Sequence, residues 1–457
     1  MEAYTKKLAD FCAGLRYEDI PQRVVSKIKW CILDNLGIIL GATRTRFGQA
    51  ILGYTQLLGD QEQATVLGFG LKTSAMSAAF ANGSLSETLE YQDGYTKGGY
   101  HPCCGTISAS LATAEWRQST GRDLIAAVTA GYEVGNRVSE AIFPSHLSRG
   151  FQPTGTAGAV GAAAAASAIL KLDREQTCNA LGIAGFILPI STGDNLWGGY
   201  TIKPVHGGAA AKAGIESALL ASRGLNAAPL EGDPKIGKGF LRIVSDQPKW
   251  ERITEGLETF STIAELYFKP FALCRVIHAP VEVAIDLRNR YGLKPEDIRE
   301  VVVRTYDFAA EVPGQTRTSP ESDPTLCQFS LPYGVAAALM YGEVGLEQMM
   351  GKATQDPRIH DLAGRVQVIH DPEMDRLRPA LRPASVQVTF QDGRKVSGRV
   401  DFPKGDARNP LTEEELLTKF SNLARDVVGE EKVRKIQEAV FALEKINAVE
   451  ELVRLLK

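Results

Sequence analysis

Hydrophobic residues recur at helical spacing along most of the first half of the chain, from residue 1 to about 225. Leu8, Phe11 and Leu15 are spaced by three and four residues, and the apolar residues between positions 24 and 36 follow the same rule. Such spacing places the apolar side chains on one face of a helix. The first half is therefore predicted to be helical.

An alanine-rich segment, AGAVGAAAAASAIL at residues 157–170, belongs to this helical half. Its small side chains let neighbouring helices approach closely. Val160, Ile169 and Leu170 add larger apolar side chains to the alanines. The segment is therefore predicted to be a helix that packs at the centre of a helical domain.

The pattern changes after the Gly- and Pro-containing stretch LEGDPKIGKGF, residues 230–240. Short runs of β-branched and alternating residues then predict strands at 300–306, 366–370, 385–390 and 395–400. Asp392 and Gly393 separate the last two runs and are typical of a hairpin turn. A helix is predicted between His278 and Tyr291.

The chain becomes helical again after Pro403. The new helix is expected to begin at Thr412, because Thr-Glu-Glu-Glu supplies a capping residue followed by acids in the first turn. The sequence therefore predicts a mainly α protein with an α+β second domain. A large helical domain is formed by residues 1–264 and by the C-terminal helices 403–457, and a smaller α+β lid domain, 265–402, is inserted between them.

Composition narrows the classes of function. The 457 residues carry a formal net charge of −3, with 44% hydrophobic and 23% charged residues. A weakly acidic chain is a poor partner for nucleic acid or anionic membrane. Seven scattered cysteines without a C-x-x-C pair, and an N-terminus without a cleavable apolar stretch, favour a cytoplasmic protein with reduced thiols.

Sequence motifs for the common cofactors are missing. The chain contains neither a phosphate-binding G-x-x-x-x-G-K-[ST] loop nor a G-x-G-x-x-G that follows a strand, and no G-x-S-x-G elbow. Its six histidines never occur as H-x-x-x-H. A zinc site at His101, Cys103 and Cys104 would require distant ligands. We therefore expect neither a metal ion nor an organic cofactor.

Three segments instead combine histidines and basic residues with glycine and proline. They are EYQDGYTKGGYHPCCG at 90–105, GDNLWGGYTIKPVHGG at 193–208 and FKPFALCRVIHAP at 268–280. Each alone could be structural, but the three together predict a distributed catalytic site for a carboxylate substrate. Its candidate residues are Asp93, His101, Lys203, His206, Lys269, Arg275 and His278. A lysine before a helix with Gly-Gly in its first turn suggests a carboxylate site with exposed amides.

The same segments resemble the MmgE/PrpD family. The resemblance is carried by HPCCGTISASLATAEW, RGFQPTGTAGAVGAAAAAS, IKPVHGGAAAKAG, FKPFALCRVIHAP and QFSLPYGVAAAL, and it extends in order to about residue 400. The family includes 2-methylcitrate dehydratase, cis-aconitate decarboxylase and iminodisuccinate epimerase. The resemblance implies a homodimer without a cofactor, a small di- or tricarboxylate substrate, and a site in the cleft between the two domains.

The resemblance also implies roles for individual residues. Asp93, His101, Lys203, Lys269 and His278 match family site residues, and Tyr333 in SLPY matches a site tyrosine. Three positions depart from the family pattern: Glu90 and Gln92 stand where aspartates are usual, and Gln152 stands where many members have histidine. Because glutamine cannot transfer a proton at neutral pH, the particular reaction stays open.

The expected chemistry is proton abstraction next to a carboxylate. Lys203, Lys269 and Arg275 would bind carboxylates and stabilise the charge that develops, while His101, oriented by Asp93, would act as the base. Asp93 itself, or His278 on the opposite face, are alternative bases. The predicted reaction is that of a 2-methylcitrate dehydratase-like hydro-lyase. The alternatives are an epimerase, a decarboxylase, and a carboxylate-binding member without turnover.

Overall fold

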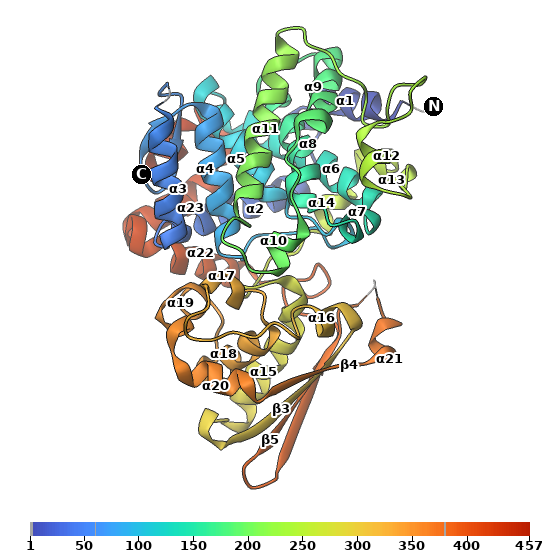
Figure 1. Cartoon of the computed structure of the whole chain (residues 1–457). Coiled ribbons are helices and arrows are strands. Elements are labelled where there is room, and N and C mark those ends of the chain that lie inside the picture. Colours follow the sequence, from blue (N-terminus) through green and yellow to red (C-terminus); the bar gives the residue numbers. More distant parts are fainter. Residues whose placement is uncertain (1–2, 60, 379–380) are drawn as a thin grey trace.

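The computed structural model describes residues 3–59, 61–378 and 381–457. The chain forms two bodies that meet at a narrow junction, a helical body and a smaller body that contains the main sheet (Figure 1). This arrangement confirms the predicted fold class, a mainly α protein with a smaller α+β part. The domain limits at residues 264 and 402 stay a prediction.

Long helices build most of the helical body. They are α1 (Tyr4–Gly14), α2 (Gln22–Ala42), α3 (Arg46–Leu58), α4 (Ala75–Thr88), α5 (Pro102–Arg117), α6 (Gly121–Ile142), α8 (Pro153–Ile169), α9 (Arg174–Ile187) and α11 (Val205–Ser222). Shorter helices connect them: α7 (Ser145–Ser148), α10 (Gly193–Trp197), α12 (Phe240–Val244), α13 (Glu251–Thr254) and α14 (Ser261–Ala264). A small hairpin of β1 (Ala64–Val66) and β2 (Leu71–Thr73), which the hydrophobic pattern did not predict, lies before α4.

The alanine-rich helix α8 lies at the centre of this body. It packs against α5, α6 and α11, as its composition predicts. All but one of the residues from Pro153 to Ile169 are buried. Small side chains on α8 thus allow several helices to share one core, and this rigid core holds the starts of α5 and α11 in place.

The smaller body contains a four-stranded sheet in the order β4-β3-β5-β6. The strands are β3 (Ile298–Thr305), β4 (Val366–His370), β5 (Ala384–Phe390) and β6 (Lys395–Val400), and only the β3–β4 pair is parallel. Around the sheet and at the junction lie α15 (His278–Tyr291), α16 (Asp307–Glu311), α17 (Pro324–Cys327), α18 (Leu331–Tyr341), α19 (Leu346–Met350), α20 (Pro357–Gly364) and α21 (Pro372–Asp375). The predicted strands and the predicted β5–β6 hairpin are confirmed.

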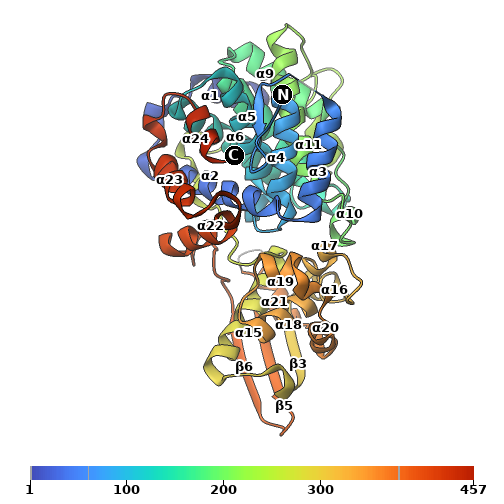
Figure 2. The same ribbon diagram turned by 90° about the vertical axis from the view of Figure 1, so that its left-hand side faces the viewer.

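The last three helices return to the helical body. α22 (Glu413–Val428) and α23 (Glu430–Phe441) pack against α2, and α24 (Glu450–Leu455) packs against α5 (Figure 2). Thr412 caps α22 by accepting a hydrogen bond from the amide of Glu415, as the Thr-Glu-Glu-Glu signal predicts. The two ends of the chain are therefore part of the same body.

Contacts between the bodies concentrate on the segment that follows α4. The hydroxyl of Tyr91 donates to the carbonyl of Pro270 at 2.8 Å, and Gly94 forms an antiparallel bridge with Tyr267. A Cβ on Gly94 would lie 2.3 Å from the Tyr267 hydroxyl, so only glycine permits this approach. The junction thus brings residues 87–95 against residues 267–270.

Candidate active site

His101 is the capping residue of α5, directly before Pro102. Its Nδ1 lies 2.7 Å from the backbone carbonyl oxygen of Asp93, and its amide donates to the hydroxyl of Thr154 at 3.3 Å. A carbonyl can only accept, so Nδ1 carries the proton and Nε2 holds the basic lone pair. No described residue forms a hydrogen bond with Nε2 of this partly exposed side chain.

Asp93 therefore orients His101 through its main chain. Its carboxylate faces elsewhere: Oδ2 accepts from the Tyr132 hydroxyl at 2.7 Å and Oδ1 from the Cys103 amide at 3.3 Å. Burial raises the pKa of Asp93 to about 6, despite these two hydrogen bonds. The expected proximity of Asp93 and His101 is thus found, although the side chain of Asp93 does not make the contact.

Lys203 lies between two buried glutamates. Its ammonium donates to Oε2 of Glu87 at 2.5 Å and to a carboxylate oxygen of Glu90, and it approaches the carbonyl of Glu87 at 3.4 Å. Burial alone would lower the pKa of Lys203, but the two carboxylates raise it above its usual value. Burial likewise works against ionisation of Glu87, yet Lys203 and then His206 hold its pKa well below the ordinary range.

Lys269 reaches the same cluster from the other body. Its ammonium donates to Oε1 of Glu90 at 2.7 Å and to the Glu90 carbonyl at 3.0 Å. Against the effect of burial, Lys203 and Lys269 lower the pKa of Glu90 to about 2. Glu90 thus bridges the two lysines and joins the helical body to the smaller body.

His101 and His206 belong to this cluster. Burial, and next the charge of Lys269, lower the pKa of His101 to about 4, while Glu87 and Glu90 act in the opposite direction. His206 Nε2 lies 3.3 Å from Oε1 of Glu87. A pocket of about 170 Å³ opens beside Lys203 and His206 and is also lined by residues 189–192 and by α10. His101 is therefore a neutral imidazole at neutral pH.

Arg275 and His278 form a second group at the junction. Arg275 Nη1 donates to Nδ1 of His278 at 3.2 Å, and Nε2 of His278 donates to the carbonyl of Leu273 at 3.0 Å. Burial, and next the charge of Arg275, lower the pKa of His278 well below its usual range. The Arg275 guanidinium lies 4.7 Å from the centre of the Tyr267 ring, which is nearly perpendicular to the ring of His101 with the ring centres 6.5 Å apart. This group is therefore next to the first cluster, but both nitrogens of His278 are engaged.

Two predicted site residues lie apart from the lysines. The Tyr333 hydroxyl donates to the carbonyl of Gln348 at 2.8 Å, and its ring packs on His360 within the smaller body. Gln152 is the capping residue of α8, two positions before the Thr154 that contacts His101. Tyr333 is thus used in the fold of the smaller body, whereas Gln152 borders the site.

The glycines at the start of α11 serve packing. A Cβ on Gly207 would lie 2.8 Å from Cys104 Cβ and 2.9 Å from Glu87 Cγ. The amides of Val205 and His206 already donate to the carbonyls of Ile202 and Lys203. Two amides at the start of α11 are therefore already used, and Gly207 lets α11 approach α4 closely enough for Lys203 to reach Glu87.

The sequence reasoning missed Glu87 and treated Glu90 only as a departure from a pattern. One signal was available, because Glu87 is the single charged residue between Ala75 and Leu89. An isolated acid in an otherwise uncharged, buried helix requires a cationic partner. Gln92, which donates to Oε2 of Glu87 at 2.7 Å, completes this face of the cluster.

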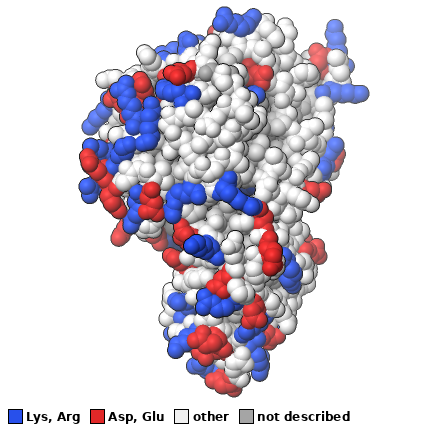
Figure 3. All heavy atoms as spheres, turned by 60° about the vertical axis from the view of Figure 1, so that its left-hand side comes forward, with Lys and Arg blue, Asp and Glu red and all other residues white. Residues whose placement is uncertain are grey.

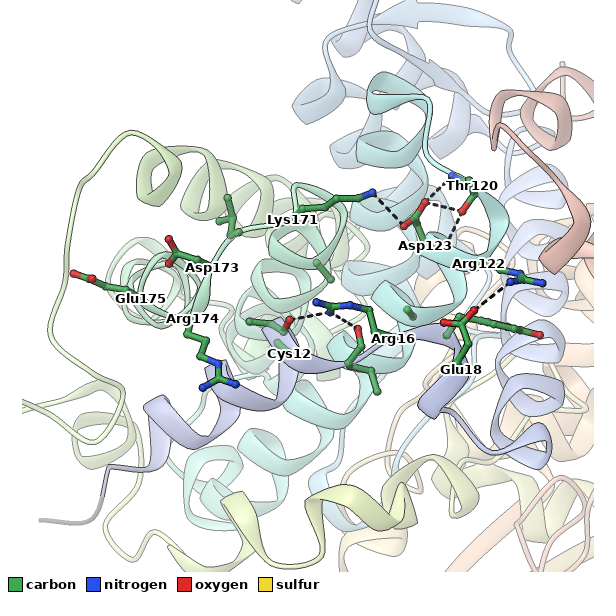
Figure 4. A pocket seen from close by; sticks show the side chains of 16 residues that line it. Cys12, Arg16, Glu18, Thr120, Arg122, Asp123, Lys171, Asp173, Arg174 and Glu175 are labelled. Carbon is green, nitrogen blue, oxygen red and sulfur yellow. Dashed lines mark hydrogen bonds and ion pairs between the residues drawn. The ribbon is translucent and has the colours of Figure 1, made fainter.

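A larger pocket of about 860 Å³ lies elsewhere on the helical body (Figure 4). Two ion pairs lie among its lining residues: Arg122 with Glu18 at 3.1 Å and Lys171 with Asp123 at 3.7 Å. None of the predicted site residues lines it. Within the described residues, no group of three or more His, Cys, Asp or Glu side chains is arranged to hold a metal ion. In the same part of the chain, no helix combines the length and hydropathy that a membrane crossing requires.

Comparison with known proteins identifies the family. Residues 6–253 match the MmgE/PrpD N-terminal domain, and residues 271–445 match the MmgE/PrpD C-terminal domain. The chain belongs to the MmgE/PrpD family. The resemblance seen in the sequence motifs is thereby confirmed.

Relatives of this MmgE/PrpD chain carry out two reactions. Cis-aconitate decarboxylase of Aspergillus terreus is 27% identical over 474 residues, which cover 99% of this chain and 95% of the relative. The human cis-aconitate decarboxylase is also 27% identical, with 100% and 95% covered. A 2-methylcitrate dehydratase of Cupriavidus necator is 24% identical over 458 residues, with 90% and 88% covered. These relatives are lyases; the decarboxylases are more similar to this chain and cover more of it than the dehydratase, but identities of 24% and 27% do not assign either reaction to it.

Proposed function

We propose that the chain is a hydro-lyase. It removes the proton next to the carboxylate of a small hydroxy acid and expels the neighbouring hydroxyl as water, with no cofactor taking part. Membership of a family whose relatives include 2-methylcitrate dehydratase supports this class of reaction. The observation that carries the proposal is the state of His101, a neutral imidazole with an unpartnered Nε2.

The fixed tautomer of His101 makes it a base. Because Nδ1 donates to the Asp93 carbonyl, Nε2 is free to take a proton from the substrate carbon. Burial and the nearby Lys269 keep the imidazole unprotonated at neutral pH. The base is thus ready before the substrate arrives.

The negative charge that develops on the substrate carboxylate needs a donor nearby. The Lys269 ammonium, which donates to the carboxylate and the carbonyl of Glu90 and also lowers the pKa of His101, is the cation that we assign to stabilise that charge. Arg275, above the ring of Tyr267, offers a second cation. Lys269 is fully buried, so a substrate that reaches it requires the smaller body to move away from the helical body.

His101 both takes the proton from the substrate and returns it to the leaving group. The Cα–H electrons form the new carbon–carbon double bond as the C–O bond breaks, and the imidazolium returns its proton to the leaving hydroxyl. Water leaves, and His101 is neutral again. No oxidant, reductant or further base is required.

The other reactions of the family fit the geometry less well. Decarboxylation requires an acid that protonates the carbanion, whereas His101 is held unprotonated. Epimerisation requires a second proton carrier on the opposite face, and both nitrogens of the candidate, His278, are engaged in hydrogen bonds. Loss of water from a hydroxy acid needs the single base that the site provides.

Exchange of substrate protons tests the proposal. Small hydroxy acids with one, two or three carboxylates are incubated with the protein in D₂O, and the Cα–H signals and new vinyl signals are followed by NMR. We expect loss of a Cα–H signal together with a vinyl signal for at least one acid. Exchange with inversion but without a vinyl product would indicate an epimerase. No exchange with any acid would refute the proposal.

Homodimer formation, implied by the family resemblance, stays a prediction. On the face shown in Figure 3, charged groups are sparse over much of the helical body. The described helical body also exposes large apolar side chains, among them Leu57, Phe186 and Ile190. Exposed apolar surface of this kind is common where subunits meet.

A further inference from the structure

Lys203 has no hydrogen-bond donor left for a substrate. An ammonium group has three N–H bonds. The carboxylates of Glu87 and Glu90 and the carbonyl of Glu87 lie within hydrogen-bond distance of its nitrogen. In this structure the chain itself therefore satisfies a lysine that was expected to bind a substrate carboxylate.

Lys269 is partly satisfied in the same way. Two of its three N–H bonds point to the carboxylate and the carbonyl of Glu90. One N–H is left, and Nε of Arg275 is a second buried donor without a hydrogen-bond partner among the described residues. Two lysines and two glutamates also cancel in charge. The remaining donors suffice for one carboxylate.

The cluster also contains unpartnered acceptors. Gln92 Oε1 and Glu87 Oε1 are buried, and none of the described residues donates a hydrogen bond to either atom. Glu87 Oε1 and His206 Nε2 are 3.3 Å apart, but without the alignment of a hydrogen bond. A buried acceptor without a donor is costly. These atoms call for a ligand that donates.

The backbone conformation of Glu90 is an independent observation that its carboxylate is held in place by its surroundings. Glu90 has φ of +49°, in the left-handed region that favours glycine and asparagine. A residue other than glycine is strained there and persists where the surroundings fix it. At Glu90 the surroundings are the two lysines that its carboxylate bridges.

We propose that Glu87 and Glu90 determine substrate specificity: they neutralise Lys203 and Lys269 and select an acid with one carboxylate and a neighbouring hydroxyl or ammonium group, instead of a di- or tricarboxylate. This inference rests on the proposed function, because it places the substrate at the same site.

Matched ligands test separately the number of carboxylates and the neighbouring hydroxyl or ammonium group of the substrate. Binding of butyrate, 3-hydroxybutyrate, 3-aminobutyrate, succinate, malate and tricarballylate to the wild-type protein is measured by calorimetry. We expect the hydroxy or the amino acid to bind at least tenfold more tightly than butyrate, and tricarballylate to bind at least tenfold more weakly than the better of the two. The hydroxy and amino members show which donor the acceptors prefer. Equal or tighter binding of tricarballylate would overturn the proposal.

Removal of one glutamate charge should reverse the preference. In Glu90→Gln, Lys203 and Lys269 regain a net positive charge, and a charge-assisted contact of this kind changes binding by roughly tenfold or more. We therefore expect tricarballylate to bind about tenfold more tightly to Glu90→Gln than to the wild type. Glu115→Gln is the matched control, since Glu115 is another buried glutamate paired with a lysine, Lys72 at 2.7 Å, outside the cluster. Unchanged ligand preference in Glu90→Gln would overturn the proposal, and so would an equal shift in the control.

The outcome can be separated from that of the proposed function. The wild-type ligand series does not depend on any variant being folded, and proton exchange in D₂O is recorded for the same acids. Exchange with malate, but not with 3-hydroxybutyrate or 3-aminobutyrate, would support proton abstraction and refute the specificity. The expected ranking without any exchange would support the specificity and refute the hydro-lyase.

Discussion

Two histidines at the junction start from similar sequence and end in different states. His101 precedes α5 and His278 begins α15, and each lies close to a buried cation. His101 is partly exposed and uses only Nδ1, so that Nε2 is free. His278 is fully buried, and its two nitrogens accept from Arg275 and donate to Leu273.

This difference shows what distinguishes a catalytic imidazole from a structural one. In both histidines burial lowers the pKa, so a perturbed pKa alone does not identify the base. A base needs a lone pair that the protein leaves unused and that the substrate can reach. By this criterion the loop at residues 90–102 holds the base, and residues 273–278 fix the smaller body.

The largest expected effect comes from replacing each histidine by asparagine. In His101→Asn the side-chain amide can still donate to the Asp93 carbonyl, but Nε2 is lost. We expect proton exchange to fall by roughly 10²- to 10⁴-fold, the usual contribution of a general base. The free energy of unfolding should stay within about 0.5 kcal/mol, since a partly exposed side chain changes while its hydrogen bond is kept. Exchange is measured by NMR and unfolding by urea titration.

His278→Asn is the matched variant and should behave in the opposite way. It leaves the buried Leu273 carbonyl without its donor, which costs about 1–3 kcal/mol of stability. Exchange per folded molecule should keep the same order of magnitude. If His278→Asn abolishes exchange while His101→Asn retains it, the assignment of base and structural residue is reversed.

The second effect concerns Lys203, which the sequence predicted to bind a substrate carboxylate and to stabilise the charge that develops there. From sequence, Lys203→Ala is expected to lose activity with the fold intact. The structure changes this expectation, because Lys203 compensates two buried carboxylates. Leaving buried charge unpaired costs about 3–5 kcal/mol. We expect Lys203→Met, which keeps most of the volume, to lower the free energy of unfolding by that amount in urea titrations at pH 7.

Lys72→Met provides the comparison for Lys203→Met. Lys72 also pairs with a buried glutamate, Glu115, but about a quarter of its side chain is exposed, so water can replace part of the lost contact. We expect its loss to cost no more than about 1–3 kcal/mol. Equal stability losses in the two variants would show that Glu87 and Glu90 are not held as charged groups by Lys203.

The sequence predicted the helices and strands of the molecule better than the side-chain contacts of its site. Strands at 366–370 and 395–400 and the helix at 278–291 have the predicted bounds, because β-branched alternation, Asp-Gly and helical spacing are local signals. The site depends on contacts between distant segments. Lys203 meets Glu87 across 116 positions, and Lys269 meets Glu90 across 179. A local sequence pattern does not predict contacts between residues that are so far apart in the chain.

Individual residues show the same limit. The approach of Asp93 and His101 was predicted from the glycines between them, but not that the main chain of Asp93 makes the contact. The Asp93 carboxylate faces Tyr132, a residue of the distant helix α6, and this contact fixes its orientation. Polar residues in a helix of small side chains, such as Glu87, are the signal that sequence reasoning could have used.

The smallest effect also separates the two regions, since only the loop at residues 90–102 contains a buried acid with a pKa near neutrality. Burial raises the pKa of Asp93 from 3.8 to about 6. Between these two values the folded protein keeps a proton that the unfolded chain releases, so this group lowers stability as the pH rises. A shift of about two units corresponds to about 3 kcal/mol, absent at pH 3 and fully present above pH 7. His101 and His278, whose pKa values are lowered, raise the stability as the pH rises. This contribution is the same in the wild type and in an Asp93 variant, so it cancels in the comparison.

We therefore expect Asp93→Asn to gain about 3 kcal/mol relative to the wild type between pH 3 and pH 7, on top of any constant change in its hydrogen bonds to Tyr132 and Cys103. Urea titrations of both proteins across this range measure the difference. Asp123→Asn should show the opposite slope: the hydrogen bonds from Thr120 lower the pKa of Asp123 against the effect of burial, so the wild type gains relative to this variant as the pH rises. A constant stability difference for Asp93→Asn would mean that Asp93 ionises as an ordinary carboxyl group. In that case the main-chain contact to His101 would be its only special feature, and the two regions would differ in the imidazoles alone.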